Sequence, residues 1–221
     1  MPLKPGSAGF PLPGVDPLVV DDEGQEVPRG QKGLLCIRRP WPGMLAGIHG
    51  NPERYRQAYW SRFPGLYYTG DYAIRDEEGY FWLLGRADEV LKVAGHRLGS
   101  LELENAAVSH PAVAEAAAVA RADPVKGEAV VLFAILREGH EASAALADSI
   151  KAHMREVVGP IAVPEEVFFV HMLPKTRSGK IMRRVLAAIA SGREIGDVST
   201  LEDEASVEEV RHAYEELRRA V

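Results

Sequence analysis

The sequence predicts an α+β protein in two parts: an antiparallel β subdomain over residues 1–87, followed by a small α+β domain over residues 88–221. The first part is rich in glycine and proline, and its short apolar runs are bounded by turn residues, which is typical of strands joined by tight turns. From residue 88 onward, apolar runs of strand length alternate with segments of helical spacing. The composition changes where the two patterns meet.

Four strands and one helix are expected in the first part. Asn51 can cap a helix and Pro52 suits its first position, so we expect a helix from there to about residue 63. The acidic run at 76–79 ends in glycine and separates two aromatic-rich segments, which predicts a β-hairpin. The strands are expected at residues 18–20, 34–37, 66–68 and 80–84.

In the second part, four strands alternate with helices. Ser100 is expected to cap the first helix, and apolar residues recur on one face of the segment 142–157, which predicts the second helix. We expect strands at residues 89–93, 113–119, 129–136 and 167–170, and helices at 100–109, 142–157, 181–190 and 207–219.

Composition excludes several function classes. A chain of 221 residues with a formal net charge of −6 lacks the basic character of a general nucleic-acid binder. Its single cysteine, Cys36, excludes an internal disulfide and lies in an apolar run, so a buried strand residue in a reducing compartment is expected. No apolar stretch is long enough to span a membrane, the start has no signal-peptide core, and the histidines lack metal-ligand spacing. We therefore expect a cytoplasmic protein with no membrane, nucleic-acid or metal site.

Lys180 is the first candidate for chemistry. It stands at the tip of a short Ser-Gly turn before the helix expected from residue 181, and Gly179 allows that turn to be tight. Lys180 would project three donors, suited to phosphate or carboxylate oxygens. The alternative is a basic helix start that only faces solvent. A Walker-type phosphate loop is excluded, because Pro174 and Ile181 occupy two of its required positions.

Three charged residues form a second group of candidates. Asp71 follows a Tyr-Thr-Gly run at the expected end of a strand, where its carboxylate can accept two hydrogen bonds from the vicinal hydroxyls of a ribose. An aspartate in an ordinary turn is the alternative. Arg86 can pair with Asp71 or contact a sugar, or form only a surface ion pair. Asp88 lies where a hinge between the two parts would fall.

The segment 95–99, Gly-His-Arg-Leu-Gly, reads as a glycine-rich turn. Gly95 permits close approach of a ligand to the backbone, and Arg97 can grip a phosphate with two hydrogen bonds. A purely structural β-turn is the alternative. His96 has no visible carboxylate partner, so it is expected to be structural.

The order and spacing of these motifs resemble those of the adenylate-forming enzymes, which comprise acyl-CoA synthetases, peptide-synthetase adenylation domains and luciferases. The resemblance extends over nearly the whole chain. Within this superfamily, the segments 95–99, 158–162 and 196–203 look like those of AMP-forming acetyl-CoA synthetases. The broader resemblance rests on residues 68–71, 85–92, 95–104 and 174–184.

The resemblance implies a ligase that works in two steps. A carboxylate, from acetate or another short carboxylic acid, attacks the α-phosphate of ATP and forms acyl-AMP and pyrophosphate. The CoA thiol then attacks the acyl carbon and AMP leaves. Lys180 matches the lysine that neutralises charge in the first step. Asp71 and Arg86 match ribose contacts, and Arg97 matches a phosphate contact.

Two further residues match CoA contacts, and one matches the hinge. Gly95 corresponds to a position beside the pantetheine tunnel, and Arg155 to an arginine that contacts the CoA nucleotide. Asp88 corresponds to the hinge on which a small mobile C-terminal domain swings between the two steps. Mg²⁺ is expected for the full enzyme, with its ligands outside this chain.

One departure from the family pattern changes the expectation. The family has a large N-terminal domain with a loop for the ATP phosphates, and no Thr-Ser-Gly-Thr-Thr-Gly-like run is present here. Residues 1–87 thus resemble the final β subdomain of that domain, and residues 88–221 the C-terminal AMP-binding-enzyme domain. The chain alone is expected to be inactive. The alternative is a non-catalytic module that binds CoA or AMP, or is regulated at Lys180 by a lysine acetyltransferase and deacetylase, and pairs with a separately encoded N-terminal half.

Overall fold

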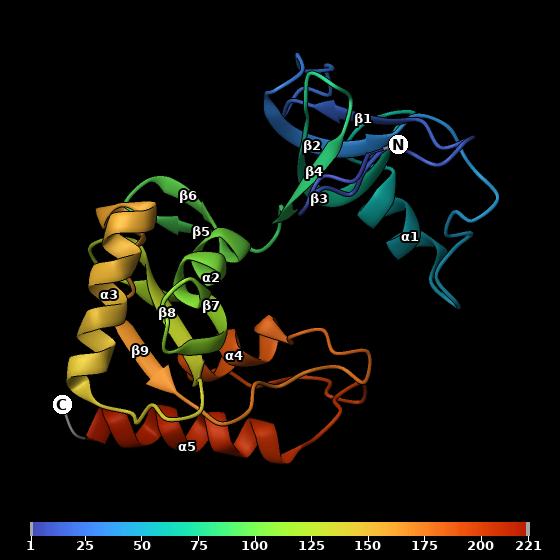
Figure 1. The fold of residues 1–221 in the computed structure, drawn as a ribbon. Coiled ribbons are helices and arrows are strands. Elements are labelled where there is room, and N and C mark those ends of the chain that lie inside the picture. Colours follow the sequence, from blue (N-terminus) through green and yellow to red (C-terminus); the bar gives the residue numbers. More distant parts are fainter. Residues whose placement is uncertain (1, 220–221) are drawn as a thin grey trace. The chain divides into compact units, whose positions relative to one another are not determined.

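The computed structural model describes residues 2–219, in two compact units, Met1–Glu89 (unit 1) and Val90–Val221 (unit 2). Each unit mixes helices with antiparallel strand pairs, so the predicted α+β class is confirmed (Figure 1). Within residues 2–219, no helix combines the length and apolar character needed to cross a membrane. The assignment of the two parts to family domains stays a prediction.

Unit 1 is built on a four-stranded antiparallel sheet in the order β1-β2-β3-β4. Alternate side chains pack on its two faces, as the period of a strand requires. Leu18, Leu34 and Cys36 pack with Phe63 on one face, and Val19 lies in a separate cluster with Ala73 and Phe81. The elements are β1 (Pro17–Val20), β2 (Lys32–Ile37), α1 (Pro52–Tyr59), β3 (Tyr67–Arg75) and β4 (Phe81–Arg86).

Two predicted boundaries in unit 1 are wrong. The helix α1 begins after its Asn51 cap as predicted but ends at Tyr59, not at residue 63. Pro64 disfavours helical angles at Phe63, and the Phe63 side chain is buried in the core. The strand β3 extends far beyond residue 68, so Asp71 lies inside the strand rather than at its end. The predicted hairpin is confirmed, since β3 and β4 pair around the turn at 76–79.

Unit 2 holds a five-stranded sheet in which β8 is central. The strand β8 pairs antiparallel with β7 and with β5, which in turn pairs with β6, and it pairs parallel with β9. The elements are β5 (Val90–Val93), β6 (His96–Gly99), α2 (Ser100–Val108), β7 (Val113–Asp123), β8 (Gly127–Leu136), α3 (Ala144–Val158), the 3₁₀ turn η1 (Pro160–Ala162), β9 (Glu166–Phe169), α4 (Arg183–Ala190) and α5 (Ala205–Arg219).

Helices cover both faces of this sheet (Figure 1). Along β8, Val130 and Leu132 pack against α2 and α3, while Val131 and Phe133 pack against α4 and α5. Both faces of β8 are therefore buried, which explains why this strand reads as an almost continuous apolar run. The result is a three-layer unit, with the two helix pairs on opposite sides of one sheet.

Three local predictions in unit 2 are corrected. The segment predicted as a glycine-rich turn is the strand β6, and only Ala94 and Gly95 form the turn. Ser100 is the first residue of α2 rather than its cap, because Gly99 takes the cap position without a side-chain hydrogen bond. The helix α4 begins at Arg183, two residues late, because Ile181 pairs with Lys175 in a short antiparallel bridge.

Candidate functional site

In unit 1, the two predicted ribose contacts lie together. Asp71 on β3 and Arg86 on β4 are direct cross-strand partners, with 3.6 Å between Arg86 Nη1 and Asp71 Oδ1. Arg86 also donates from Nε and Nη2 to the two carboxylate oxygens of Asp88, at 2.9 and 3.1 Å. The Asp88 hydrogen bonds raise the pKa of Arg86 above its usual value. Asp88, predicted as a hinge, thus lies within the same charged cluster.

This arrangement depends on a glycine. Gly70 has a φ of +82°, and a Cβ atom built there would lie 2.7 Å from Arg86 Nη2. The guanidinium therefore packs over the bare backbone of β3, where its Nη1 donates to the carbonyl oxygen of Thr69 at 3.0 Å. Asp71 remains 31% exposed in its side chain, so its carboxylate can accept hydrogen bonds from a ligand's hydroxyl groups. The exposed carboxylate of Asp71, held beside Arg86, is therefore suited to bind a ligand with two neighbouring hydroxyl groups.

In unit 2, Lys180 closes a small hairpin. The Thr176 N–H donates to the Lys180 carbonyl at 2.8 Å, and the Gly179 N–H donates to the Thr176 carbonyl at 2.8 Å. The Lys180 N–H in turn donates to Thr176 Oγ1 at 3.1 Å. The Lys180 side chain is exposed. A lysine on a backbone fixed in this way presents its ammonium group from a defined position.

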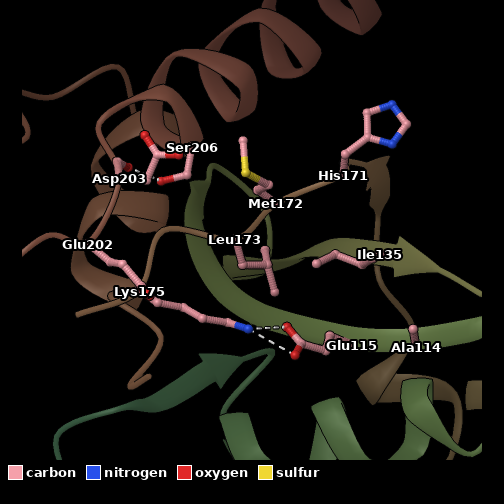
Figure 2. A pocket seen from close by; sticks show the side chains of 10 residues that line it. All are labelled: Ala114, Glu115, Ile135, His171, Met172, Leu173, Lys175, Glu202, Asp203 and Ser206. Atoms are coloured by element: carbon pink, nitrogen blue, oxygen red, sulfur yellow. Dashed lines mark hydrogen bonds and ion pairs between the residues drawn. The ribbon is translucent and has the colours of Figure 1, made fainter. Parts of the chain in front are cut away.

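The base of the hairpin is tied to the sheet by a second lysine. Figure 2 shows Lys175 reaching the carboxylate of Glu115 on β7, with Nζ to Oε2 at 2.7 Å. The pair lines a cavity of about 640 Å³, which is also lined by Asp203 and the buried Ser206. The backbone of Lys175 accepts a hydrogen bond from the N–H of Glu202 at 2.9 Å. Lys175 is therefore structural, while Lys180 faces outward.

Arg97 and Gly95 belong to the β5–β6 hairpin. Its turn has positive φ at both residues, 48° at Ala94 and 81° at Gly95. A Cβ atom at Gly95 would meet nothing within 4 Å, so the backbone there is open to a ligand. Arg97 lies directly across from Lys92, which places two cations on neighbouring strands. His96 is exposed, and its Nδ1 is 3.1 Å from the Ala94 carbonyl oxygen.

Arg155 lies in the last turn of α3, before the chain reverses at Gly159. It lines a cavity of about 330 Å³ together with Ala94 of the β5–β6 turn and Lys126 of the β7–β8 turn. Gly95 and Arg155 are the two residues predicted to contact one ligand. Arg155 lines this cavity, and Gly95 directly follows Ala94, which also lines it. Lys126 adds a second cation there that the sequence did not single out.

Sequence reasoning also missed a buried ion pair near Lys180. Glu104 of α2 is only 5% exposed, and Arg183 donates to both of its carboxylate oxygens at 2.7 Å. The signal available in the sequence was a glutamate that directly follows the apolar Leu103 in α2, but Glu102 and Asn105 nearby are also polar, so the signal was weak. Among the described residues, no three His, Cys, Asp or Glu side chains are grouped to hold a metal ion.

Two family models and several curated relatives match this chain. The family model for the AMP-binding enzyme C-terminal domain matches residues 102–180, and the model for the AMP-binding enzyme matches residues 2–48. The acetyl-coenzyme A synthetase of Pyrobaculum arsenaticum is 60% identical over 99% of the chain, and the 3-hydroxypropionyl-coenzyme A synthetase of Sulfurisphaera tokodaii is 52% identical over all of it. The chain spans only about a third of their length, 32% and 34%.

A solved structure gives the same result. The anthranilate CoA ligase AuaEII, solved in complex with anthranoyl-AMP, matches 86% of the chain with a TM-score of 0.74 and 34% identity. The chain covers 36% of that protein. The fold, the two family models and the curated relatives therefore all indicate one family.

Proposed function

Since the chain belongs to the AMP-binding enzyme family, whose C-terminal domain it carries, we propose that its residues serve the ligation of a short carboxylic acid to CoA, driven by cleavage of ATP to AMP and pyrophosphate. The observation that carries the proposal is the exposed Lys180 on a fixed hairpin, in a chain 60% identical to an acetyl-coenzyme A synthetase. One relative of 52% identity is named a 3-hydroxypropionyl-coenzyme A synthetase, so the acid is proposed only as short.

In the first step, a carboxylate oxygen attacks the α-phosphorus of ATP, and the bond to the bridging oxygen of pyrophosphate breaks. Negative charge from both reactants is concentrated at this point. The ammonium group of Lys180 is proposed to stabilise that charge, a role typical of lysines in phosphoryl and acyl-phosphate chemistry. Asp71 is proposed to accept hydrogen bonds from the ribose hydroxyls, with Arg86 as its neighbour and Arg97 on a phosphate.

In the second step, the CoA sulfur attacks the acyl carbon, and the bond from that carbon to the AMP oxygen breaks. The open backbone at Gly95 and the cavity beside Arg155 support a role in holding CoA. Arg155 offers a fork that suits a phosphate of the CoA nucleotide. Asp88 is proposed as the hinge between the steps. Its hydrogen bonds with Arg86 would fix one setting of that hinge.

Mg²⁺ is expected in the family's reaction, where it would neutralise the ATP phosphates. The described residues offer no group of three potential ligands, so we assign none of them to the metal. A Ser/Thr/Gly-rich phosphate loop is also absent from the sequence, and we propose that turnover requires residues beyond these. Acetylation of the exposed Lys180 would remove its charge and block the first step. That regulation, pairing with a separate N-terminal half, and a cytoplasmic location stay predictions.

The proposal is tested by measuring acetate-, ATP- and CoA-dependent release of AMP and pyrophosphate. The assay uses the purified chain and a hybrid in which the chain replaces the matching part of the Pyrobaculum arsenaticum enzyme. We expect turnover by the hybrid only. Asp71→Ala should raise the KM for ATP in the hybrid, and Arg193→Ala, which removes an exposed cation of unit 2, should change nothing. A hybrid that folds but forms no AMP would contradict the proposal.

A further inference from the structure

The ion pair between Glu104 and Arg183 is the most buried one described in this chain. The side chains are 7% and 18% exposed, and the guanidinium spans both carboxylate oxygens, with Nε to Oε1 and Nη2 to Oε2 both at 2.7 Å. Glu104 Oε1 also accepts a hydrogen bond from the backbone N–H of Ala118 on β7, at 3.0 Å. One carboxylate thus joins α2, the sheet and the start of α4.

Such a pair is poorly explained by stability alone. Desolvating two charges costs free energy that their attraction offsets only in good geometry, and an apolar pair of similar volume is often as stable. A buried pair of this kind is better suited to fixing one arrangement of the chain against others.

What the pair fixes is the start of α4, three residues after Lys180. The two residues between them are held by a backbone hydrogen bond, by burial and by a β-bridge. The Met182 N–H donates to the Pro174 carbonyl at 2.8 Å, Met182 is buried, and Ile181 pairs with Lys175. Any shift of Arg183 must therefore move the strand of the hairpin that carries Lys180.

The segment that follows α4 restrains both α4 and the first strand of the hairpin. Arg184 donates to the carbonyl oxygens of Ile195 and Asp197, and Thr176 bridges to Leu201. These bonds come from the segment that follows α4, so they restrain the hairpin against its own C-terminal neighbour. Among the described residues, Glu104 is the one residue of α2 that forms an ion pair with this region, and Lys175 at the base of the hairpin pairs separately with Glu115 of β7.

We propose that Glu104, acting through Arg183, is a positioning residue for Lys180. This inference rests on the proposed function, in which Lys180 acts on the transferred group. The pair sets the hairpin's register against α2 and the sheet, so that the side chain of Lys180 extends from one backbone position. Misplacement of a reacting group by about 1 Å can lower a rate by about 10²-fold.

The first test measures amide hydrogen exchange in the chain itself. Glu104→Gln keeps the size of the side chain and its acceptor for Ala118, but removes its charge. The control is Glu166→Gln, which breaks the ion pair between Glu166 and Arg121 in the same unit, 3.0 Å long and 22% and 17% exposed. We expect Glu104→Gln, unlike the control, to accelerate exchange selectively at the amides of Gly179, Lys180 and Met182. Equal acceleration throughout unit 2 in both variants would overturn the inference.

The second test separates the two half-reactions in the hybrid enzyme. Glu104→Gln should lower the kcat of acetate-dependent ATP–pyrophosphate exchange by about 10²-fold and leave thioester formation from added acetyl-AMP and CoA within about 2-fold. Arg183→Lys keeps Glu104 paired but loses the fork, so it should fold and show the same selective defect. If Lys180→Ala abolishes exchange while both variants keep it, the positioning role is wrong. If Lys180→Ala itself keeps exchange, the proposed function fails, and the inference with it.

Discussion

Replacing Gly70 with alanine should displace Arg86 from Asp71. The φ of +82° is unfavourable for a residue with a Cβ, which costs about 1–2 kcal/mol. The new methyl group would also lie 2.7–2.9 Å from three guanidinium atoms of Arg86, so the guanidinium must move off the Thr69 carbonyl. Losing that hydrogen bond costs about 1 kcal/mol, a modest value because Arg86 is partly exposed. We therefore expect a total destabilisation of about 2–3 kcal/mol.

The matched control is Gly65→Ala, because Gly65 has a φ of +80° and open space around it. It should cost only the backbone term, about 1–2 kcal/mol. All three tryptophans, Trp41, Trp60 and Trp82, lie in unit 1, so urea unfolding followed by tryptophan fluorescence reports this unit alone. Gly70→Ala should exceed the control by about 1 kcal/mol. Equal losses in the two variants would refute the argument that Arg86 packs on the bare backbone.

Three other outcomes are expected. Burial raises the pKa of the Cys36 thiol to about 11, so the thiol should react with a disulfide reagent at pH 8 only on unfolding. The free energy of unfolding should also decline from pH 9 towards 11, because the thiol ionises in the unfolded chain first. Rapid reaction in the folded chain would contradict this. Burial, with the charges of His153 and His140, lowers the pKa of His110 below 6.5. The stability that this shift contributes is present above pH 6.5 and should be lost as the pH falls through the pKa of the folded state. Titration of the ring by NMR should show the lowered pKa, and a midpoint at or above 6.5 would refute it. Phe168→Ala should destabilise unit 2 by about 3–5 kcal/mol in thermal unfolding followed by circular dichroism, because the ring is 1% exposed; a loss below about 1 kcal/mol would contradict the core assignment.

Elements whose identity depends on local pattern were predictable. The strands β1 and β2, the hairpin β3–β4 and the apolar strand β8 follow from periodicity and turn residues that can be read within a few positions. The strand β6 was missed because Gly-His-Arg-Leu-Gly has little strand propensity, and its conformation is imposed by pairing with β5. In the turn between them, Ala94 has a φ of 48°, and no turn motif in the sequence predicts this conformation.

The candidate site divides in the same way. The sequence offered the pairing of Asp71 with Arg86 as one option, but it did not predict the shorter bonds from Arg86 to Asp88. Glu104 and Arg183 are 79 positions apart, so no local pattern links them, and only the packing of both α2 and α4 against β7 brings them together. The roles of Lys180, Arg97, Gly95 and Arg155 rest on family resemblance and remain predictions.

Lys180 is proposed to serve the adenylation step and not the transfer to CoA. This role is tested most directly by comparing acetate-dependent ATP–pyrophosphate exchange with thioester formation from acetyl-AMP and CoA, in the hybrid enzyme and its Lys180→Ala variant. Loss of one group that stabilises developing charge typically lowers a rate by about 10²–10³-fold. We predict such a loss in the exchange reaction, with thioester formation unchanged. An equal loss in both reactions, or none in either, would contradict this account.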